Sequence, residues 1–228
     1  MKRKIKKALI SLSDKSNLKS VLKILKKFNI KIISSGGTSK EIKKLGFNYT
    51  EISKFTKSSE ILDGRVKSLH PKIYAGILSK RDSKKHYKEL KNNNYEEIDL
   101  IICNFYPFEK ILEKTKNHKK IIENIDIGGP TLVRAAAKNY KDVTVVTNPS
   151  QYQNLITEIE KNKGFTNLDF RKKLSEEAFG QTAHYDTIIN NYFSNKTNNI
   201  FPKRKLISPN LIEKLRYGEN PHQEAAIY

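Results

Sequence analysis

The stretch IDLIICN, residues 98–104, decides the fold. Its four consecutive apolar residues lie between polar ones, a pattern typical of a strand that is buried on both faces. Similar short runs occur at 8–12 (ALISL), 30–34 (IKIIS) and 142–146 (DVTVV). Between the first two, apolar residues recur every three or four positions over 18–28, as in an amphipathic helix. This alternation predicts an α/β fold in which helices flank a parallel sheet.

The remaining segments of the sequence show less regular hydrophobic patterns. Ser13 or Asp14 is expected to cap the helix of residues 18–28. Segment 54–80 contains scattered Gly and Pro, and it is expected to be irregular. The remaining expected elements are an edge strand at 49–53 and helices at 38–45, 131–139, 150–161 and 167–193.

The body of the chain is expected to form one domain over residues 1–195, followed by a linker and tail over 196–228. Its single cysteine, Cys103, excludes an intramolecular disulfide framework and fits a reducing compartment. The sequence has no apolar run of about 18 residues and no secretory signal. We therefore expect a soluble, cytoplasmic protein without membrane contact.

The net charge of +20, from 44 Lys and Arg against 24 Asp and Glu, raises the question of a nucleic-acid partner. Lysine supplies most of this charge and is scattered, whereas arginine, which base readout and bidentate phosphate contacts prefer, is scarce. Lys, Ile and Asn share AT-rich codons, so codon bias explains much of the excess. We expect no nucleic-acid partner, although a positive field would still attract a phosphorylated metabolite.

Polar clusters follow several of the predicted strands. They are SLSDK (11–15), SGGT (35–38), CNFYPF (103–108) and, at the start of a helix, IDIGG (125–129). In an open parallel sheet, ligands bind beyond the carboxyl ends of the strands. This convergence predicts a ligand site at that edge of the sheet.

Each cluster alone has an ordinary structural explanation. SGGT suits a phosphate monoester, but it equally suits a turn that needs Gly. GRVKSLHPK (64–72) could be a basic surface loop, Asp126 a helix cap, and Lys138 a favourable charge at a helix C-terminus. The histidines are dispersed without metal-ligand spacing, so no metal site is expected.

The motifs in order resemble one family closely. They are SLSDK (11–15), SSGGTSKEIKKLG (34–46), LDGRVKSLHPKIYAGIL (62–78), CNFYPF (103–108), ENIDIGGPTLVRAAAKN (123–139) and LRYGENPHQ (215–223). They resemble the N-terminal portion of the bifunctional purine-biosynthesis proteins that join IMP cyclohydrolase to AICAR transformylase. The resemblance is almost continuous over 8–193, and it implies the methylglyoxal-synthase-like (MGS-like) fold.

The resemblance also implies an activity, that of a cyclic amidine hydrolase acting in the direction of ring closure. The N-terminal domain of that family converts 5-formamidoimidazole-4-carboxamide ribotide (formyl-AICAR) to IMP with loss of water, the last step of de novo purine biosynthesis. No metal or other cofactor is implied for this step, whose partner is one phosphoribosyl substrate. 10-Formyltetrahydrofolate belongs only to the transformylase step.

Site residues follow from the resemblance by motif position. Lys138 is expected to transfer protons, tuned by Asp126, while Lys67 stabilises the formyl oxygen and Tyr106 and Asn104 hold the carboxamide. The implied substrate-binding residues are Ser11, Ser13, Asp14, Lys15, Ser35, Gly36, Gly37, Thr38, Arg65, Val66, Ser68, Cys103, Ile127, Gly128 and Gly129. Lys67→Ala and Lys138→Ala are each expected to lower turnover strongly without unfolding the protein.

The chain stops at Tyr228, soon after LRYGENPHQ, where the family continues into its transformylase domain. Residues 196–228 are thus expected to be the start of that domain, and Arg216 and Tyr217 match AICAR-binding residues that lack the rest of their site. We expect cyclohydrolase activity without transformylase activity. The family implies a homodimer for the full-length protein.

Two other functions on the same fold stay open. One is a non-catalytic domain that binds a purine nucleotide, which would be expected to lack the two lysines. The other is a lyase of the methylglyoxal synthase type, which would not need CNFYPF or the helix that ends in AAAKN.

Overall fold

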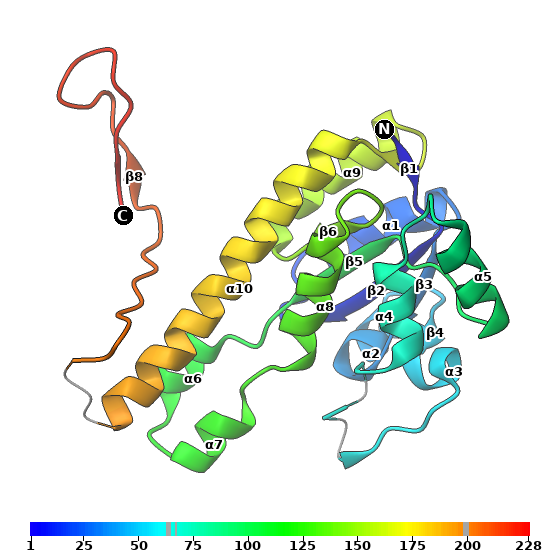
Figure 1. Cartoon of the computed structure of the whole chain (residues 1–228), viewed down its shortest axis with the longest axis horizontal. Helices are drawn as coiled ribbons and strands as arrows, with labels where there is room; N and C mark the ends of the chain where they lie inside the picture. Colours follow the sequence, from blue (N-terminus) through cyan, green and yellow to red (C-terminus); the bar gives the residue numbers. More distant parts are fainter. Residues whose placement is uncertain (63–64, 67, 198–200) are drawn as a thin grey trace. The chain divides into compact units, whose positions relative to one another are not determined.

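The computed structural model describes residues 1–62, 65–66, 68–197 and 201–228. Within them a sheet of five parallel strands runs in the order β4-β3-β2-β5-β6 (Figure 1). The strands are β4 (Thr50–Glu51), β3 (Lys31–Ser34), β2 (Lys7–Leu12), β5 (Leu100–Asn104) and β6 (Thr144–Val146). The predicted α/β fold is thereby confirmed, including the central place of the 98–104 run and the edge strand near residue 50.

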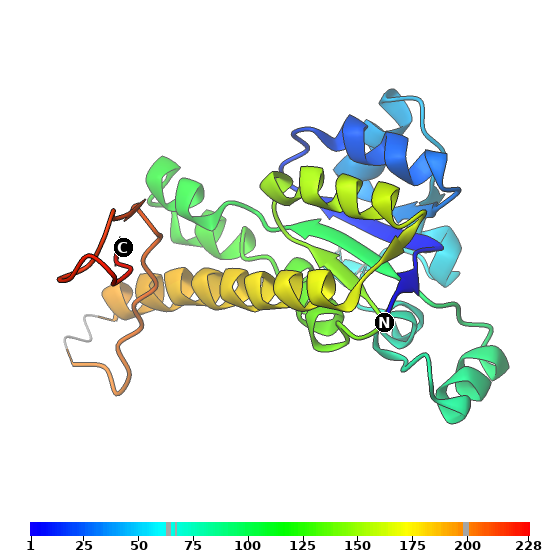
Figure 2. The same cartoon turned by 90° about the horizontal axis from the view of Figure 1, so that it is seen from above.

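Helices cover both faces of this sheet (Figure 2). Helices α1 (Leu18–Lys27) and α9 (Tyr152–Lys161) pack side by side on one face, and α4 (Pro71–Leu78) and α8 (Gly128–Lys138) on the other. Because both faces are covered, the central strands carry continuous buried apolar runs: Ala8, Leu9 and Ile10 are fully buried, as are Leu100, Ile101 and Ile102 in β5. The described core is one continuous cluster around β2 and β5.

The structure corrects the prediction that 54–80 is irregular. It contains α3 (Ile52–Thr56) and the two-turn helix α4. Pro71 is the first residue of α4, where a missing backbone N–H costs nothing, and the ring nitrogen of His70 caps the helix. Gly76 lies inside α4 because a Cβ there would come within 2.5 Å of the Glu96 carbonyl oxygen.

The predicted cap of α1 is also wrong. Asn17, in the left-handed conformation, precedes the helix, and Asp14 instead accepts hydrogen bonds from the backbone N–H and hydroxyl of Ser16. Helix α2 (Gly36–Lys44) begins earlier than predicted and includes both glycines. The remaining helices are α5 (Lys84–Asn92), α6 (Phe108–Lys114), α7 (His118–Glu123), the 3₁₀ turn η2 (Pro149–Gln151) and α10 (Leu168–Lys196).

The chain forms two compact units, Met1–Thr182 and Ala183–Tyr228. The first also holds a short antiparallel pair of β1 (Arg3–Lys4) with β7 (Phe165–Thr166). The second holds the antiparallel pair of β8 (Glu213–Lys214) with β9 (Ala226–Ile227). Helix α10 continues to Lys196, one residue into the predicted linker. The domain boundary at 195/196 stays a prediction. Within the described residues, no helix has the length and apolar character to cross a bilayer.

Candidate functional site

The pairing of β2 with β5 places Asn104 beside the loop that leaves β2. Asn104 lies opposite Leu12 in the ladder. Its side-chain Oδ1 accepts hydrogen bonds from the backbone N–H groups of Ser13 (2.7 Å) and Asp14 (3.0 Å). Its Nδ2 donates to the Asp14 carbonyl at 2.8 Å. The amide predicted to hold a carboxamide substrate is thus engaged with this loop on both its oxygen and its nitrogen.

Thr38 holds the same loop from the other side. Its Oγ1 accepts from the Leu12 N–H (2.8 Å) and donates to the Leu12 carbonyl (3.1 Å), and the residue is buried. Ser35, the residue before α2, is also buried. The first turn of α2 is therefore fixed next to the end of β2, with Gly36 at a positive φ of 59°.

Lys15 joins the SLSDK and SGGT clusters. Its Nζ donates to the Ser13 carbonyl at 3.1 Å, and a Cβ added to Gly37 would lie 3.8 Å from that nitrogen. An ammonium group thus lies beside the start of a nine-residue helix, where N–H groups and the helix dipole attract anions. The Asp14 carboxylate is turned to Ser16, whose hydroxyl and N–H lower its pKa.

Asp126 lies before α8, where a carboxylate is partly removed from water. Burial raises its pKa, and the backbone N–H groups of Gly129, Tyr106 and Gly128 act in the opposite direction. The Gly129 N–H reaches Asp126 Oδ1 at 2.9 Å. A Cβ at Gly129 would come within 2.5 Å of the other carboxylate oxygen. Only glycine at 129 therefore allows this close approach.

Cys103 lies beneath the first turn of α8. Its side chain is buried, 3.8 Å from the Gly129 carbonyl oxygen, and burial raises the pKa of its thiol. The thiol is therefore protonated at neutral pH and unsuited to nucleophilic attack. Ser11 pairs with Cys103 across the ladder, while Tyr106 and Ile127 are exposed at the same edge.

Of the segment around residues 65–68, the described residues Arg65, Val66 and Ser68 lie near this edge. A Cβ at Gly128 would lie 2.6 Å from Ser68 Oγ, so that hydroxyl faces the first residue of α8. Arg65 forms an exposed ion pair with Glu123 at the end of α7. Val66 lines a hollow of about 320 Å³ between this segment and α3. Lys67 lies outside the described residues.

Lys138 does not join the other predicted residues. It is the last residue of α8, and Asp126 precedes the first. An eleven-residue helix is about 16 Å long, more than a lysine side chain spans. Lys138 thus lies toward the amino end of the sheet, next to Asn139, whose amide donates to the carbonyls of Ile77 and Ser79. Arg216 and Tyr217 belong to the second compact unit and are exposed there.

Some contacts at this edge escaped the prediction. Phe105 lies against Gly129, where an added Cβ would be 3.1 Å from its ring, and Ser16 holds Asp14. Glu123 pairs with Arg65. It is the first residue of the ENIDIGG motif, and this motif was the feature of the sequence that could have identified it as a site residue. Among the described residues, no three His, Cys, Asp or Glu side chains are grouped to hold a metal ion.

Two family models match this chain. The model described as "MGS-like domain" matches residues 17–131. The model described as "AICARFT/IMPCHase bienzyme" matches residues 136–228. Together they cover the SGGT, CNFYPF and IDIGG clusters and the C-terminal unit, while the SLSDK cluster at 11–15 lies before the first match.

Similar proteins bear the description "Bifunctional purine biosynthesis protein PurH". That of Prochlorococcus marinus (strain MIT 9515) is 48% identical over 97% of this chain, and that of Persephonella marina (strain DSM 14350 / EX-H1) is 46% identical over 98%. The chain spans only 42% and 44% of the two relatives. A solved structure titled "Crystal structure of ForH" aligns with a TM-score of 0.74 and 26% identity, covering 83% of this chain and 99% of that one.

Replacing Gly129 tests the packing around Asp126. We expect Gly129→Ala to destabilise the protein by about 1–3 kcal/mol, because the new methyl overlaps the carboxylate and the Phe105 ring. Thermal or urea unfolding measures this. Gly180→Ala is the matched control, since a Cβ there meets nothing within 4 Å, and a helical glycine replaced by alanine should gain about 0.5–1 kcal/mol. Equal stability changes in the two variants would contradict the arrangement.

Replacing Asn104 tests its hold on the 13–14 loop. We expect Asn104→Ala to speed amide hydrogen exchange at Ser13 and Asp14, because both N–H groups lose their acceptor. Asn93→Ala removes an amide that donates to the Glu89 carbonyl within its own helix turn, so exchange at Ser13 and Asp14 should not change. Unchanged protection in Asn104→Ala would show that the loop is held by other contacts.

Proposed function

We propose that this chain, which belongs to the MGS-like domain family and corresponds to the N-terminal part of the bifunctional purine biosynthesis proteins, is an IMP cyclohydrolase. The reaction is ring closure of formyl-AICAR to IMP with loss of water. The observation that carries the proposal is the meeting of four separate motifs at one edge of the sheet. The chain is also 48% identical to such a protein over 97% of its own residues.

The substrate's 5′-phosphate would bind where Lys15 meets the first turn of α2. Backbone N–H groups at the start of that helix and the ammonium of Lys15 offer a positive environment for a phosphate monoester. The hydroxyl of Thr38 is engaged with Leu12, so in this proposal Thr38 positions the loop instead of contacting the phosphate. Asn104 has the same positioning role.

The reacting groups would lie near Asp126 and Tyr106. In the cyclisation the carboxamide nitrogen forms a bond to the formyl carbon, and the formyl oxygen takes up a proton. The C–O bond of that intermediate then breaks, and water leaves as the ring nitrogen gives up its proton. Asp126, with a pKa above the ordinary value, is suited to move these protons near neutral pH. The reaction is redox-neutral, and we propose no cofactor for it.

The two predicted catalytic lysines enter this proposal differently. Lys67 keeps its predicted role at the formyl oxygen, which its motif neighbours Arg65 and Ser68 support by lying at the same edge. Lys138 is about 16 Å from Asp126 along α8, so its tuning by Asp126 is not part of the proposal. Lys138→Ala separates the two accounts, because the helix geometry predicts retained turnover and the family resemblance predicts its loss.

A cofactor-free assay of formyl-AICAR conversion, followed by ultraviolet absorbance, tests the activity. We expect IMP to form with wild-type protein and KM to rise at least about tenfold in Lys15→Gln, because a charge-assisted phosphate contact is lost. Lys19→Gln on the exposed side of α1 is the control and should not change KM. Binding of IMP without any turnover would instead support the non-catalytic nucleotide-binding function.

The raised pKa of Asp126 predicts a pH dependence. If the ionised carboxylate accepts a proton in the reaction, kcat/KM should fall on the acid side with a midpoint above about 3.9, the ordinary aspartate value. Asp126→Asn should remove this acid limb and lower kcat, since an amide cannot accept the proton. An unchanged profile in Asp126→Asn would exclude Asp126 from proton transfer, while leaving substrate binding by Lys15 intact.

A further inference from the structure

A large cavity lies at the opposite edge of the sheet, where β2 and β3 begin. Its volume is about 680 Å³, within the range of small-molecule sites. It lies between the amino ends of the strands, α5, and the 95–99 segment that leads into β5. Its lining combines five lysines and three acidic residues with the rings of Phe28, Tyr87 and Tyr95.

Most of the acidic charge in this cavity is already neutralised. Glu96 forms an ion pair with Lys7. Arg81 lies 3.6 Å from Glu97 and 3.7 Å from Asp99, and Asp99 also accepts the backbone N–H groups of Lys6 and Lys7. Of the five lining lysines, the described ion pairs engage Lys7 alone. Lys4, Lys6, Lys31 and Lys91 therefore leave this cavity with an excess of positive charge.

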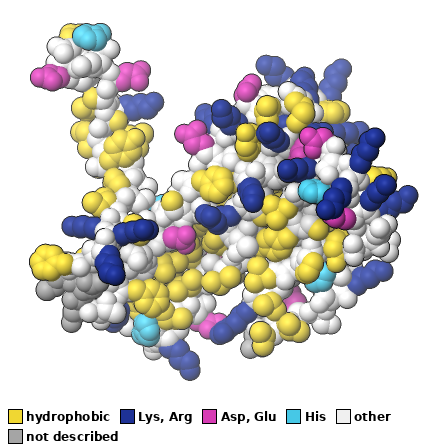
Figure 3. Space-filling view, in the orientation of Figure 1, with side chains coloured by type: hydrophobic (Ala, Val, Ile, Leu, Met, Phe, Trp, Pro, Cys, Tyr) yellow, Lys and Arg dark blue, Asp and Glu magenta, His cyan; other side chains and the backbone are white. Residues whose placement is uncertain are grey.

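Two further lysine ammonium groups lie in the core near this edge. Lys7 and Lys72 are only 7% and 9% exposed, and their ammonium groups lie 5.3 Å and 4.8 Å from the centre of one ring, Phe55. The charges of Lys31 and Lys72 add to the hydrogen bond from Lys7 in lowering the pKa of Glu96. Lys7 is paired with Glu96, while Lys72 adds its charge to that of the exposed lysines at this edge. Lys and Arg side chains crowd over the region of β1 and α5 (Figure 3).

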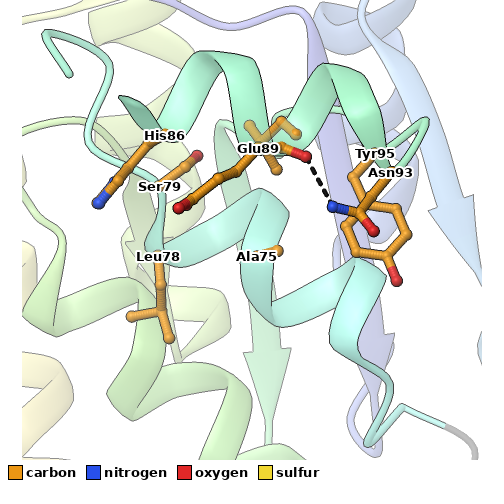
Figure 4. Close-up of a pocket in the computed structure, with 8 residues that line it drawn as sticks. Ala75, Leu78, Ser79, His86, Glu89, Asn93 and Tyr95 are labelled. Atoms are coloured by element: carbon orange, nitrogen blue, oxygen red, sulfur yellow. Dashed lines mark hydrogen bonds between the residues drawn. The ribbon is translucent and has the colours of Figure 1, made fainter. Parts of the chain in front are cut away.

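Aromatic rings supply the other half of a ligand site. Tyr87 of α5 is 63% exposed although it lines the cavity, and Tyr95 and Phe28 lie partly exposed beside it. Planar ligands stack on such rings, and cations attract phosphate. A neighbouring hollow of about 360 Å³ between α4 and α5 shares Leu90 and Tyr95 but has no lining lysine (Figure 4). Of the two hollows, the one of about 680 Å³ is therefore the one lined by lysines, and we call it the amino-edge cavity.

We propose that the amino-edge cavity binds a phosphorylated aromatic metabolite of the nucleoside monophosphate class. Its phosphate would lie among Lys31, Lys91 and Lys6, and its base would stack on Tyr87. A cavity of this volume suits such a small ligand better than a nucleic-acid strand, which needs an extended basic surface. This site lies at the other edge of the sheet from the proposed cyclohydrolase site and does not depend on that function.

NMR titration of the whole chain with AMP tests the proposal. At about 50 mM salt, where charge attraction is weakly screened, we expect AMP to shift backbone amide signals of residues 4–7, 29–31 and 87–97. The double variant Lys31→Gln, Lys91→Gln should weaken this binding at least about tenfold. Tyr87→Ala should weaken AMP but not ribose 5-phosphate, which has no base to stack.

The matched control removes the same charge elsewhere. Lys19→Gln with Lys23→Gln, on the exposed side of α1, should leave AMP binding at the amino edge within about twofold. If both double variants weakened AMP binding equally, the loss would come from the change in net charge alone, and the proposal would be overturned. So would AMP shifts confined to the carboxyl edge of the sheet, or no shift of residues 87–97 at about 5 mM AMP.

Discussion

The register between β2 and β5 is the constraint on which the carboxyl-edge site depends. It sets Leu12 opposite Asn104, and from that position one side-chain amide binds the backbone of Ser13 and Asp14 by three hydrogen bonds. Thr38 adds two more at Leu12. A shift of one residue would turn Asn104 to the other face of the sheet and leave the loop unsupported.

Both edges of the sheet concentrate positive charge, but they do so by different means. At the carboxyl edge one lysine, Lys15, lies beside backbone N–H groups, so the site gains from helix geometry as much as from side-chain charge. At the amino edge the charge comes from lysines of separate segments around aromatic rings. A net charge of +20 is thus compatible with two small anion sites and needs no nucleic-acid partner.

Strands were predictable because burial on both faces leaves continuous apolar runs, as in residues 98–104. Helix α4 was not, because Pro71 and Gly76 resemble breaks until Pro71 is seen at a helix start and Gly76 against the Glu96 carbonyl. The carboxyl-edge clustering followed from strand order, but the backbone-directed roles of Asn104 and Thr38 depend on register. The amino-edge cavity left no local signal, since its lysines are separated in a lysine-rich chain.

Helix α8 restricts how the carboxyl edge can work. Its first turn packs close to Asp126 and Cys103, and glycine at 129 permits this approach because it has no Cβ. Its other end is held by Asn139, whose amide donates to the carbonyls of Ile77 and Ser79 at the C-terminal end of α4. With both ends fixed, α8 acts as a rigid spacer between Asp126 and Lys138. Because the length of the helix sets their separation, direct proton exchange between these two side chains would require α8 itself to unwind.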